Sequence, residues 1–172
     1  MMTQPNWEPF VITENGAHAD APRSIHSPEG IGDRLRAAAF AEIQARDAFL
    51  WASNTFQDAP PSLRNAWAGL ALAEQRHFDW IMKRMQELGV SPSARKVSDQ
   101  LWYSLINCKT AENFAIFIAS AEERGRKAGV RFYEAMKEKD PVTSEIFRKI
   151  AEEEVAHIAL ATKYFPHTAL RS

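Results

Sequence analysis

Cysteine is nearly absent from this chain of 172 residues, since Cys108 is the only one. A single cysteine excludes an internal disulfide, a cysteine-based zinc site and a paired-cysteine redox centre within the chain. Seven glycines and nine prolines are too few for a collagen-like or low-complexity sequence. The 21 basic residues nearly cancel the 22 acidic ones, leaving a formal charge of -1. A dedicated binder of nucleic acid or of anionic membranes is therefore not expected.

Long apolar runs are also missing. Uncharged stretches such as residues 48–56 are far shorter than the ~20 residues that a membrane-spanning helix needs. Residues 1–10 carry Glu8 and lack the basic start and apolar stretch of an export signal. We therefore expect a cytoplasmic protein. The hydrophobic fraction of 45% is ordinary for a globular protein, and the length suits a single domain.

Four stretches in which apolar residues recur every three or four positions predict four long helices. Three of them follow a capping or proline signal of the kind that opens helices, namely Ser27-Pro28, Thr110 and Asp140-Pro141, and the second helix follows the break at Ala59-Pro60-Pro61. The expected helices span about residues 28–57, 61–88, 110–138 and 141–165. No alternating strand pattern competes with them. Two short turns and one long crossover predict an all-α four-helix bundle made of two antiparallel hairpins.

The remaining segments are an N-terminal arm and the crossover. Residues 1–27 show no helical period and predict an extended arm, followed by the bundle domain of residues 28–172. The arm is either disordered or packed on the bundle through its apolar residues Trp7, Phe10, Val11 and Ile12. In the crossover at 90–110, Ser91-Pro92 could open a short helix, and residues 101–103 are expected to pack against the bundle. Either segment could shape a cavity or form a homodimer contact.

Each predicted helix carries polar exceptions on its apolar face. These exceptions are four carboxylates and two histidines: Glu42, Glu74, His77, Glu122, Glu154 and His157. Burying four carboxylates without compensation would be strongly unfavourable. A pair of divalent cations would compensate them. The six side chains are therefore our candidate metal ligands.

The spacing of these residues favours one shared layer. The pairs at 74–77 and 154–157 are both Glu-x-x-His, and residues three apart lie on one helix face. Glu42 precedes the first pair by 32 residues, and Glu122 precedes the second by the same 32. The midpoints between Glu42 and the first histidine and between Glu122 and the second are 59.5 and 139.5, within the predicted turns. All six groups would then stand at one depth.

Two neighbouring acidic residues compete for these positions. Glu123 adjoins Glu122 but is rotated about 100° around the helix axis. Glu153 shares a face with His157 at i, i+4, but Glu154 repeats the Glu-x-x-His geometry and is preferred. The other glutamates of that run are expected in solvent.

Arg76, directly before His77, has two interpretations. It can orient a carboxylate outside the ligand set, such as Asp79 or Glu153, or it can simply lie at the surface. The surface position is commoner for arginine and is favoured here.

The ligand set indicates which metals fit. Four carboxylates and two imidazoles suit iron or manganese, whereas zinc usually takes fewer carboxylates. Iron is the first expectation, with manganese or a mixed iron–manganese pair as alternatives. Two ions would lie about 3.5–4 Å apart and be bridged by carboxylates. By position, Glu74 and Glu154 are the better bridging candidates, and Glu42 and Glu122 are better suited to terminal ligation.

At these residues the chain resembles the ferritin-like di-iron carboxylate superfamily, in which one Glu from each of two helices and a Glu-x-x-His from each of the other two hold two metals. The resemblance covers about residues 28–165. More narrowly, the chain looks like a ferritin-like branch known only as a domain of unknown function and related to tRNA-hydroxylating di-iron enzymes. The Glu-x-Arg-Gly form supports Glu122 over Glu123. The matching stretches are Ser27–Gly30, Ala41–Ala45, Glu74–Phe78, Leu88-Gly89 and Glu122–Gly125.

The resemblance implies non-haem di-iron chemistry with O2 or peroxide. Our first hypothesis is an O2-activating oxidase or hydroxylase with an unknown small or nucleoside-like substrate and an unknown electron donor. The alternatives are a ferroxidase or peroxide-scavenging iron protein, and a structural metal-binding bundle that acts through a partner. No catalytic residue beyond the metal ligands is assigned. A substrate-sized cavity beside the metals would favour the first hypothesis.

Overall fold

A computed structural model of the protein describes residues 4–168, and over these residues the chain is helical. The long helices are α1 (Pro28–Thr55), α2 (Pro61–Glu87), α4 (Ala111–Met136) and α5 (Pro141–Tyr164). Shorter elements are the 3-10 turn η1 (Glu14–Gly16) and the helix α3 (Gln100–Ile106). The described part of the chain contains no β-strand, only an isolated bridge between Ile12 and Val97. The all-α prediction is confirmed.

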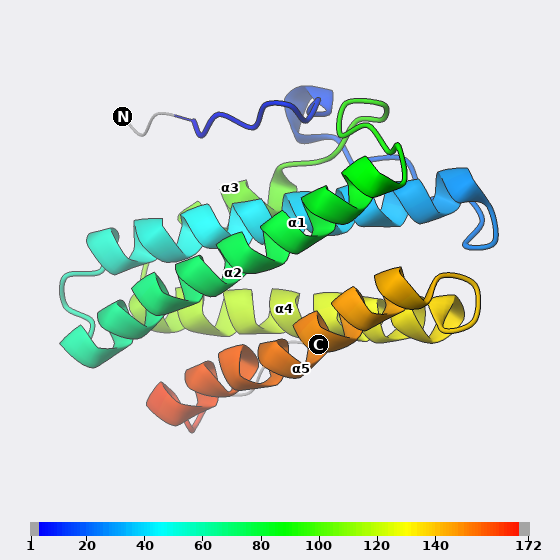
Figure 1. The fold of residues 1–172 in the computed structure, drawn as a ribbon. Helices are drawn as coiled ribbons and strands as arrows, with labels where there is room; N and C mark the ends of the chain where they lie inside the picture. The colour runs from blue at the N-terminus through cyan, green and yellow to red at the C-terminus, as the bar shows by residue number, and fades with distance from the viewer. Residues whose placement is uncertain (1–3, 169–172) are drawn as a thin grey trace.

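The long helices pair along the chain. Figure 1 shows α1 and α2 turning back on one another as one hairpin, and α4 and α5 as a second hairpin beneath it. Contacts between neighbours within each hairpin far exceed those between hairpins. Over residues 4–168, no helix combines the length and the hydrophobicity that crossing a bilayer would need.

The capping signals operate as predicted. Ser27 Oγ accepts the Gly30 N–H at 3.0 Å, and Thr110 Oγ1 accepts the Asn113 N–H at 3.1 Å. Prolines occupy the first position of α1, α2 and α5, where a missing backbone N–H costs nothing. Because these caps satisfy backbone donors that otherwise lack partners, they fix where α1 and α4 begin, whereas α2 begins at Pro61 without a side-chain cap. The helix starts were therefore well predicted, whereas α1 and α4 end two residues earlier than expected.

The crossover differs from the prediction. Ser91-Pro92 opens no helix; the segment forms turns, and Arg36 Nε donates to the Ser91 carbonyl at 3.0 Å. The short helix is α3 instead. It buries Trp102 and Leu105, and the Trp102 N–H donates to the buried Gln44 side chain at 3.0 Å. Burial against α1 stabilises this helix, which has no side-chain cap of its own.

The described part of the arm packs on the helices. Trp7 and Phe10 are buried, and their rings lie 5.3 and 5.1 Å from the ring of Phe40 on α1. The Val97 N–H donates to the Val11 carbonyl at 2.9 Å, which joins the arm to the crossover. The Val11 side chain itself is exposed. Of the two alternatives for the arm, packing is the one observed from residue 4 onward.

The two ends of the helical body are filled differently. At the end beside the α1–α2 turn, Phe49, Trp67 and Phe114 are buried against one another, with Trp67 and Phe114 ring centroids 5.3 Å apart. Toward the α4–α5 turn, α1 and α4 face each other with small residues such as Ala38 and Gly129. Large side chains therefore close one end, and space remains between α1 and α4 at the other.

Candidate metal centre

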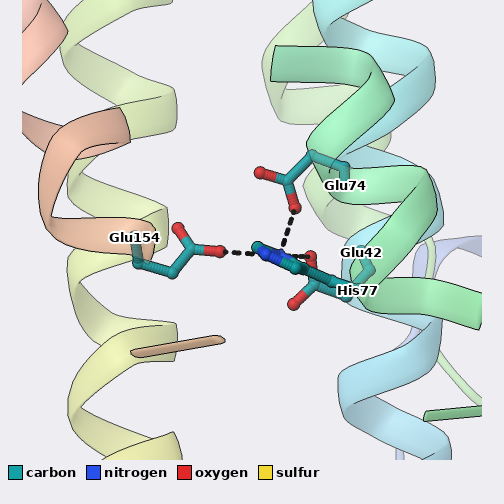
Figure 2. A group of neighbouring side chains, drawn as sticks. All are labelled: Glu42, Glu74, His77 and Glu154. Atoms are coloured by element: carbon teal, nitrogen blue, oxygen red, sulfur yellow. Dashed lines mark ion pairs between the residues drawn. The ribbon is translucent and has the colours of Figure 1, made fainter. Parts of the chain in front are cut away.

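The six predicted ligands meet in one layer about halfway along the long helices. Each long helix contributes a carboxylate, and α2 and α5 also contribute the two histidines. Figure 2 shows part of this layer, with Glu154 of α5 facing Glu42 of α1 and Glu74 and His77 of α2. All six side chains are nearly or fully withdrawn from solvent, the most exposed being Glu42 at 12%.

The layer contains two overlapping groups of potential metal ligands. One group is Glu42, Glu74, His77 and Glu154; the other is Glu74, Glu122, Glu154 and His157. Within each group the ligand atoms lie within 4.8 Å of one another. Atoms bound at about 2.0–2.2 Å to one ion lie within about 4.4 Å of each other, so each group is close to coordination distance. Glu74 and Glu154 belong to both groups, which is the arrangement expected of bridging carboxylates.

Each imidazole turns its Nδ1 atom toward three carboxylates. His77 Nδ1 lies 3.4 Å from Glu42, 3.6 Å from Glu154 and 3.8 Å from Glu74. His157 Nδ1 lies 3.1 Å from Glu74, with Glu154 at 3.7 Å and Glu122 at 4.0 Å. Most of these separations exceed the 2.7–3.2 Å of a good hydrogen bond. The groups thus converge without pairing closely.

Several polar atoms of the layer are buried with no hydrogen-bond partner among the described residues. They are His77 Nδ1, both carboxylate oxygens of Glu122 and one oxygen of Glu154. A buried polar group left unpaired costs about 1–3 kcal/mol, and more when it is charged. Cations placed among these atoms would satisfy them. The residues present therefore fit divalent metal ions, and these buried Glu and His groups could hold them.

The predicted position of one residue outside the ligand set was wrong. Glu153, expected in solvent, is 35% exposed and its Oε2 lies 2.8 Å from His77 Nε2. Arg76 forms an ion pair with the same carboxylate while remaining at the surface, so both interpretations of Arg76 hold in part. Asp79 instead accepts a hydrogen bond from Gln75. Because Glu153 holds the outer nitrogen of His77, the inner Nδ1 is directed at the carboxylates.

The other competing carboxylate lies where it was predicted. Glu123 turns away from the layer and accepts two hydrogen bonds from Arg126, both at 2.8 Å. The hydrogen bonds from Arg126 are the main reason that the pKa of Glu123 lies below its usual value. Glu122, one residue earlier, points inward instead. The rotation of about 100° between adjacent helical residues explains their opposite placements.

Without a cation, the layer can reduce its negative charge only by holding protons. Burial, and then the neighbouring carboxylates, raise the pKa values of Glu42 and Glu122, and burial likewise raises the pKa of Glu154. Burial alone would raise the pKa of Glu74, but its contacts with Glu42 and with the two histidines lower it. Burial alone would lower the pKa of His77, but its carboxylate neighbours raise it. Metal ions would displace these protons.

A cavity of about 550 Å³ opens onto the layer. Glu42, Glu74, Glu122 and Glu154 all line it, so four of the six groups face the same space. The rest of its wall is mostly apolar and comes mainly from α1, α4 and α5. The sequence pattern does not predict this cavity, because its only signal is the small residues on two helices that do not follow one another. Its volume falls within the range of small-molecule sites.

The fold and the site define an all-helical protein whose buried Glu and His groups could bind metal. By sequence, the chain belongs to the family described as "Protein of unknown function (DUF455)", whose profile matches residues 4–172. No curated protein and no solved structure matched the chain significantly.

Proposed function

We propose that the protein is a ferritin-like, non-haem di-metal oxidoreductase that activates O2 to oxidise or hydroxylate a small molecule. In this proposal the two hairpins form a four-helix bundle around two metal ions. Iron is the expected metal, and a manganese or mixed pair would use the same ligands. Glu42 and His77 would hold one ion, and Glu122 and His157 would hold the other. Glu74 and Glu154 belong to both ligand groups and would be shared.

The observation that carries this proposal is the cavity against the carboxylate layer. A protein that only oxidised iron would need a path for ions, whereas this space is large enough for an organic molecule and has mostly apolar walls. Apolar walls lower the polarity around the carboxylates and strengthen the electrostatic interactions there. The cavity therefore favours an oxidase or hydroxylase over a ferroxidase or a purely structural metal site.

The residues of the chain have distinct roles in this proposal. A pair of reduced irons, once bound, would supply electrons to O2. The four carboxylates balance the charge of the two ions, and Glu153 fixes the ring orientation of His77. Small side chains on α1 and α4 leave room for a substrate directly above the ligands. An external electron donor would restore the reduced state after each turnover.

The metal centre is tested by loading the protein with Fe(II) without oxygen, then measuring iron per chain and the absorption spectrum. We expect about two irons per wild-type chain and loss of most of this iron in Glu74→Ala and Glu154→Ala, since each removes a carboxylate that both ions share. Glu152→Ala is the matched control, because this exposed residue lies two positions from Glu154 and pairs with Arg148. Iron content unchanged by either core variant would reject the centre.

Oxygen uptake separates the oxidase or hydroxylase from the ferroxidase. The reduced, iron-loaded protein is given O2 alone or with small organic acids, alcohols and nucleosides. We expect at least one additive class to accelerate uptake and to yield an oxidised product. Oxidation of Fe(II) far beyond two per chain, at a rate that no additive changes, would contradict the proposal and favour a ferroxidase.

A further inference from the structure

From the carboxylate layer, most of the cavity lining extends toward the N-terminal half of α1 and the C-terminal half of α4. We call the carboxylate level the inner end of the cavity and the opposite part of the lining its outer end. Figure 1 shows these two halves at the same end of the molecule. Arg34 on α1 and Arg131 on α4 line the outer part, eight and nine residues from the carboxylates of their own helices. At ~1.5 Å per residue, about 12–14 Å separates the two levels.

Between these levels the wall consists mostly of small residues. Ala38 and Ala41 of α1 face Gly125 and Gly129 of α4 across the cavity. Gly125 is exposed, and a Cβ atom added to it would meet no heavy atom within 4 Å, so the cavity is open beside this residue. The small residues give the middle of the cavity the apolar character that a hydrocarbon segment needs.

The outer end carries positive charge that the described residues do not neutralise. Arg34 donates to the backbone carbonyls of Arg23 and Gly30, at 2.7 and 2.8 Å, and over residues 4–168 it forms no ion pair. Arg131 is exposed and likewise forms no ion pair with the described residues. Arg126, the third arginine of the lining, is neutralised by Glu123. Two guanidinium groups are thus available to an anion at the cavity mouth.

We propose that the cavity binds an elongated molecule with an anionic head group and an apolar body. The head group lies against Arg34 and Arg131, and the apolar body reaches past Gly125 toward the carboxylate layer. A carboxylate and a phosphate ester share the required chemistry, since arginine binds both through paired hydrogen bonds. Binding itself depends only on the cavity; that the inner end of the molecule is oxidised rests on the proposed function.

The orientation follows from charge. The four carboxylates at the inner end offer no positive charge to an anion when they are metal-free, and with metal their charge balances that of the two ions. Among the described residues, Arg34 and Arg131 are the only cationic groups that line the cavity and form no ion pair. A head group at the mouth also places the part of the molecule that carries no charge next to the ligands.

Decanoate, decyl phosphate and decanol are suitable probes. Their binding to the full-length protein is measured by calorimetry or tryptophan fluorescence, in the metal-free and the iron-loaded forms. We expect decanoate or decyl phosphate to bind at least about tenfold more tightly than decanol, because a charge-assisted hydrogen bond to arginine accounts for about that factor. The tighter of the two anions identifies the head group. Equal binding of decanol would overturn the proposal.

Two pairs of variants locate the ligand. Arg131→Gln should weaken decanoate binding about tenfold, whereas Arg124→Gln, an exposed arginine of α4 outside the lining, should not. Gly125→Leu places a bulky side chain on the cavity wall, where the apolar body would lie, and should abolish binding. Gly69→Leu is its matched control, since Gly69 lies exposed on α2 with open space around it. Leucine favours helix more than glycine does, so both glycine variants should fold.

The outcomes separate this inference from the proposed function. If the wild type loads two irons and binds decanoate, and Gly125→Leu loses this binding, the result supports both the ligand class and the metal centre. Binding by a chain that takes up no iron supports the ligand class and rejects the di-metal oxidase or hydroxylase. Decanoate binding that survives Gly125→Leu, or no binding of either anion by a chain that loads two irons, overturns the ligand class and leaves the metal centre standing.

Discussion

Single residues account for most of what the sequence revealed about the site. The six inward-facing groups were identifiable because each interrupts an apolar face, and the matched spacing of the Glu-x-x-His pairs placed them at one depth. Glu153 was missed for a physical reason. Its contact with His77 depends on how α5 lies against α2, and a carboxylate one position from a predicted ligand gives no sign of this in the sequence.

The role of Glu153 can be tested by Glu153→Gln, which keeps the shape of the side chain and removes its charge. We expect metal affinity to fall about 10- to 100-fold, because the partner of a ligating histidine fixes the ring and increases its basicity. Affinity is measured by competition with a chelator. The neighbouring Glu152→Gln should leave it unchanged, since Glu152 pairs with Arg148 at the surface. Equal affinity of Glu153→Gln and wild type would refute this role.

At the scale of elements, local signals predicted every long helix. Caps and first-turn prolines act within one turn of the chain, so they can be recognised without knowing the fold. The helix α3 had no such signal, because it has no capping side chain and is stabilised by the burial of Trp102 and Leu105. Short elements that depend on tertiary burial are therefore the ones that local patterns miss.

Asp140 has both a local and a tertiary role at the start of α5, because it caps this helix and pairs with a residue of α2. Its carboxylate accepts the Thr143 N–H at 3.1 Å and also pairs with Arg84 of α2 at 2.8 Å. Asp140→Ala should lower the free energy of unfolding by about 1–2 kcal/mol, since it removes the cap and the ion pair together. Asp140→Asn keeps a capping oxygen and should lose less.

Urea denaturation of the metal-free protein measures both Asp140 variants. Asp58→Ala, in the exposed α1–α2 turn, is the control and should change stability little. Equal losses for Asp140→Ala and Asp140→Asn would show that the ion pair with Arg84, and not the cap, stabilises this end of α5.

At the scale of the whole molecule, the contacts between distant segments could not be predicted. The cavity exists because small residues on α1 lie opposite small residues on α4 and leave space between the two helices. These helices are about 80 residues apart in sequence. The same limit applies to Asp33 at the N-terminal end of α1. This carboxylate is buried and pairs with Arg23 of the arm, Arg36 of α1 and Arg95 of the crossover. One residue thus connects three segments.

The charge of Asp33 should make stability depend on pH. The hydrogen bonds from Arg23, and then the charge of Arg95, outweigh burial and hold the pKa of Asp33 below its usual range. A carboxylate whose pKa is lower in the folded state stabilises the fold above its unfolded pKa of about 3.9 and loses this effect as pH falls through the folded value. Asp33→Asn should therefore be about 3 kcal/mol less stable than wild type at pH 7.

This difference should shrink steadily as pH falls below about 4, because protonation removes from the wild type the charge that the variant already lacks. Urea unfolding of both proteins in their metal-free form, at a series of pH values, measures it. The carboxylates of the metal layer also titrate, but they are common to both proteins and cancel in the comparison. Asp58→Asn, at an exposed position of the α1–α2 turn, should show no such trend. A difference independent of pH would mean that Asp33 acts through shape, and that its charge does not hold the arm and the crossover to α1.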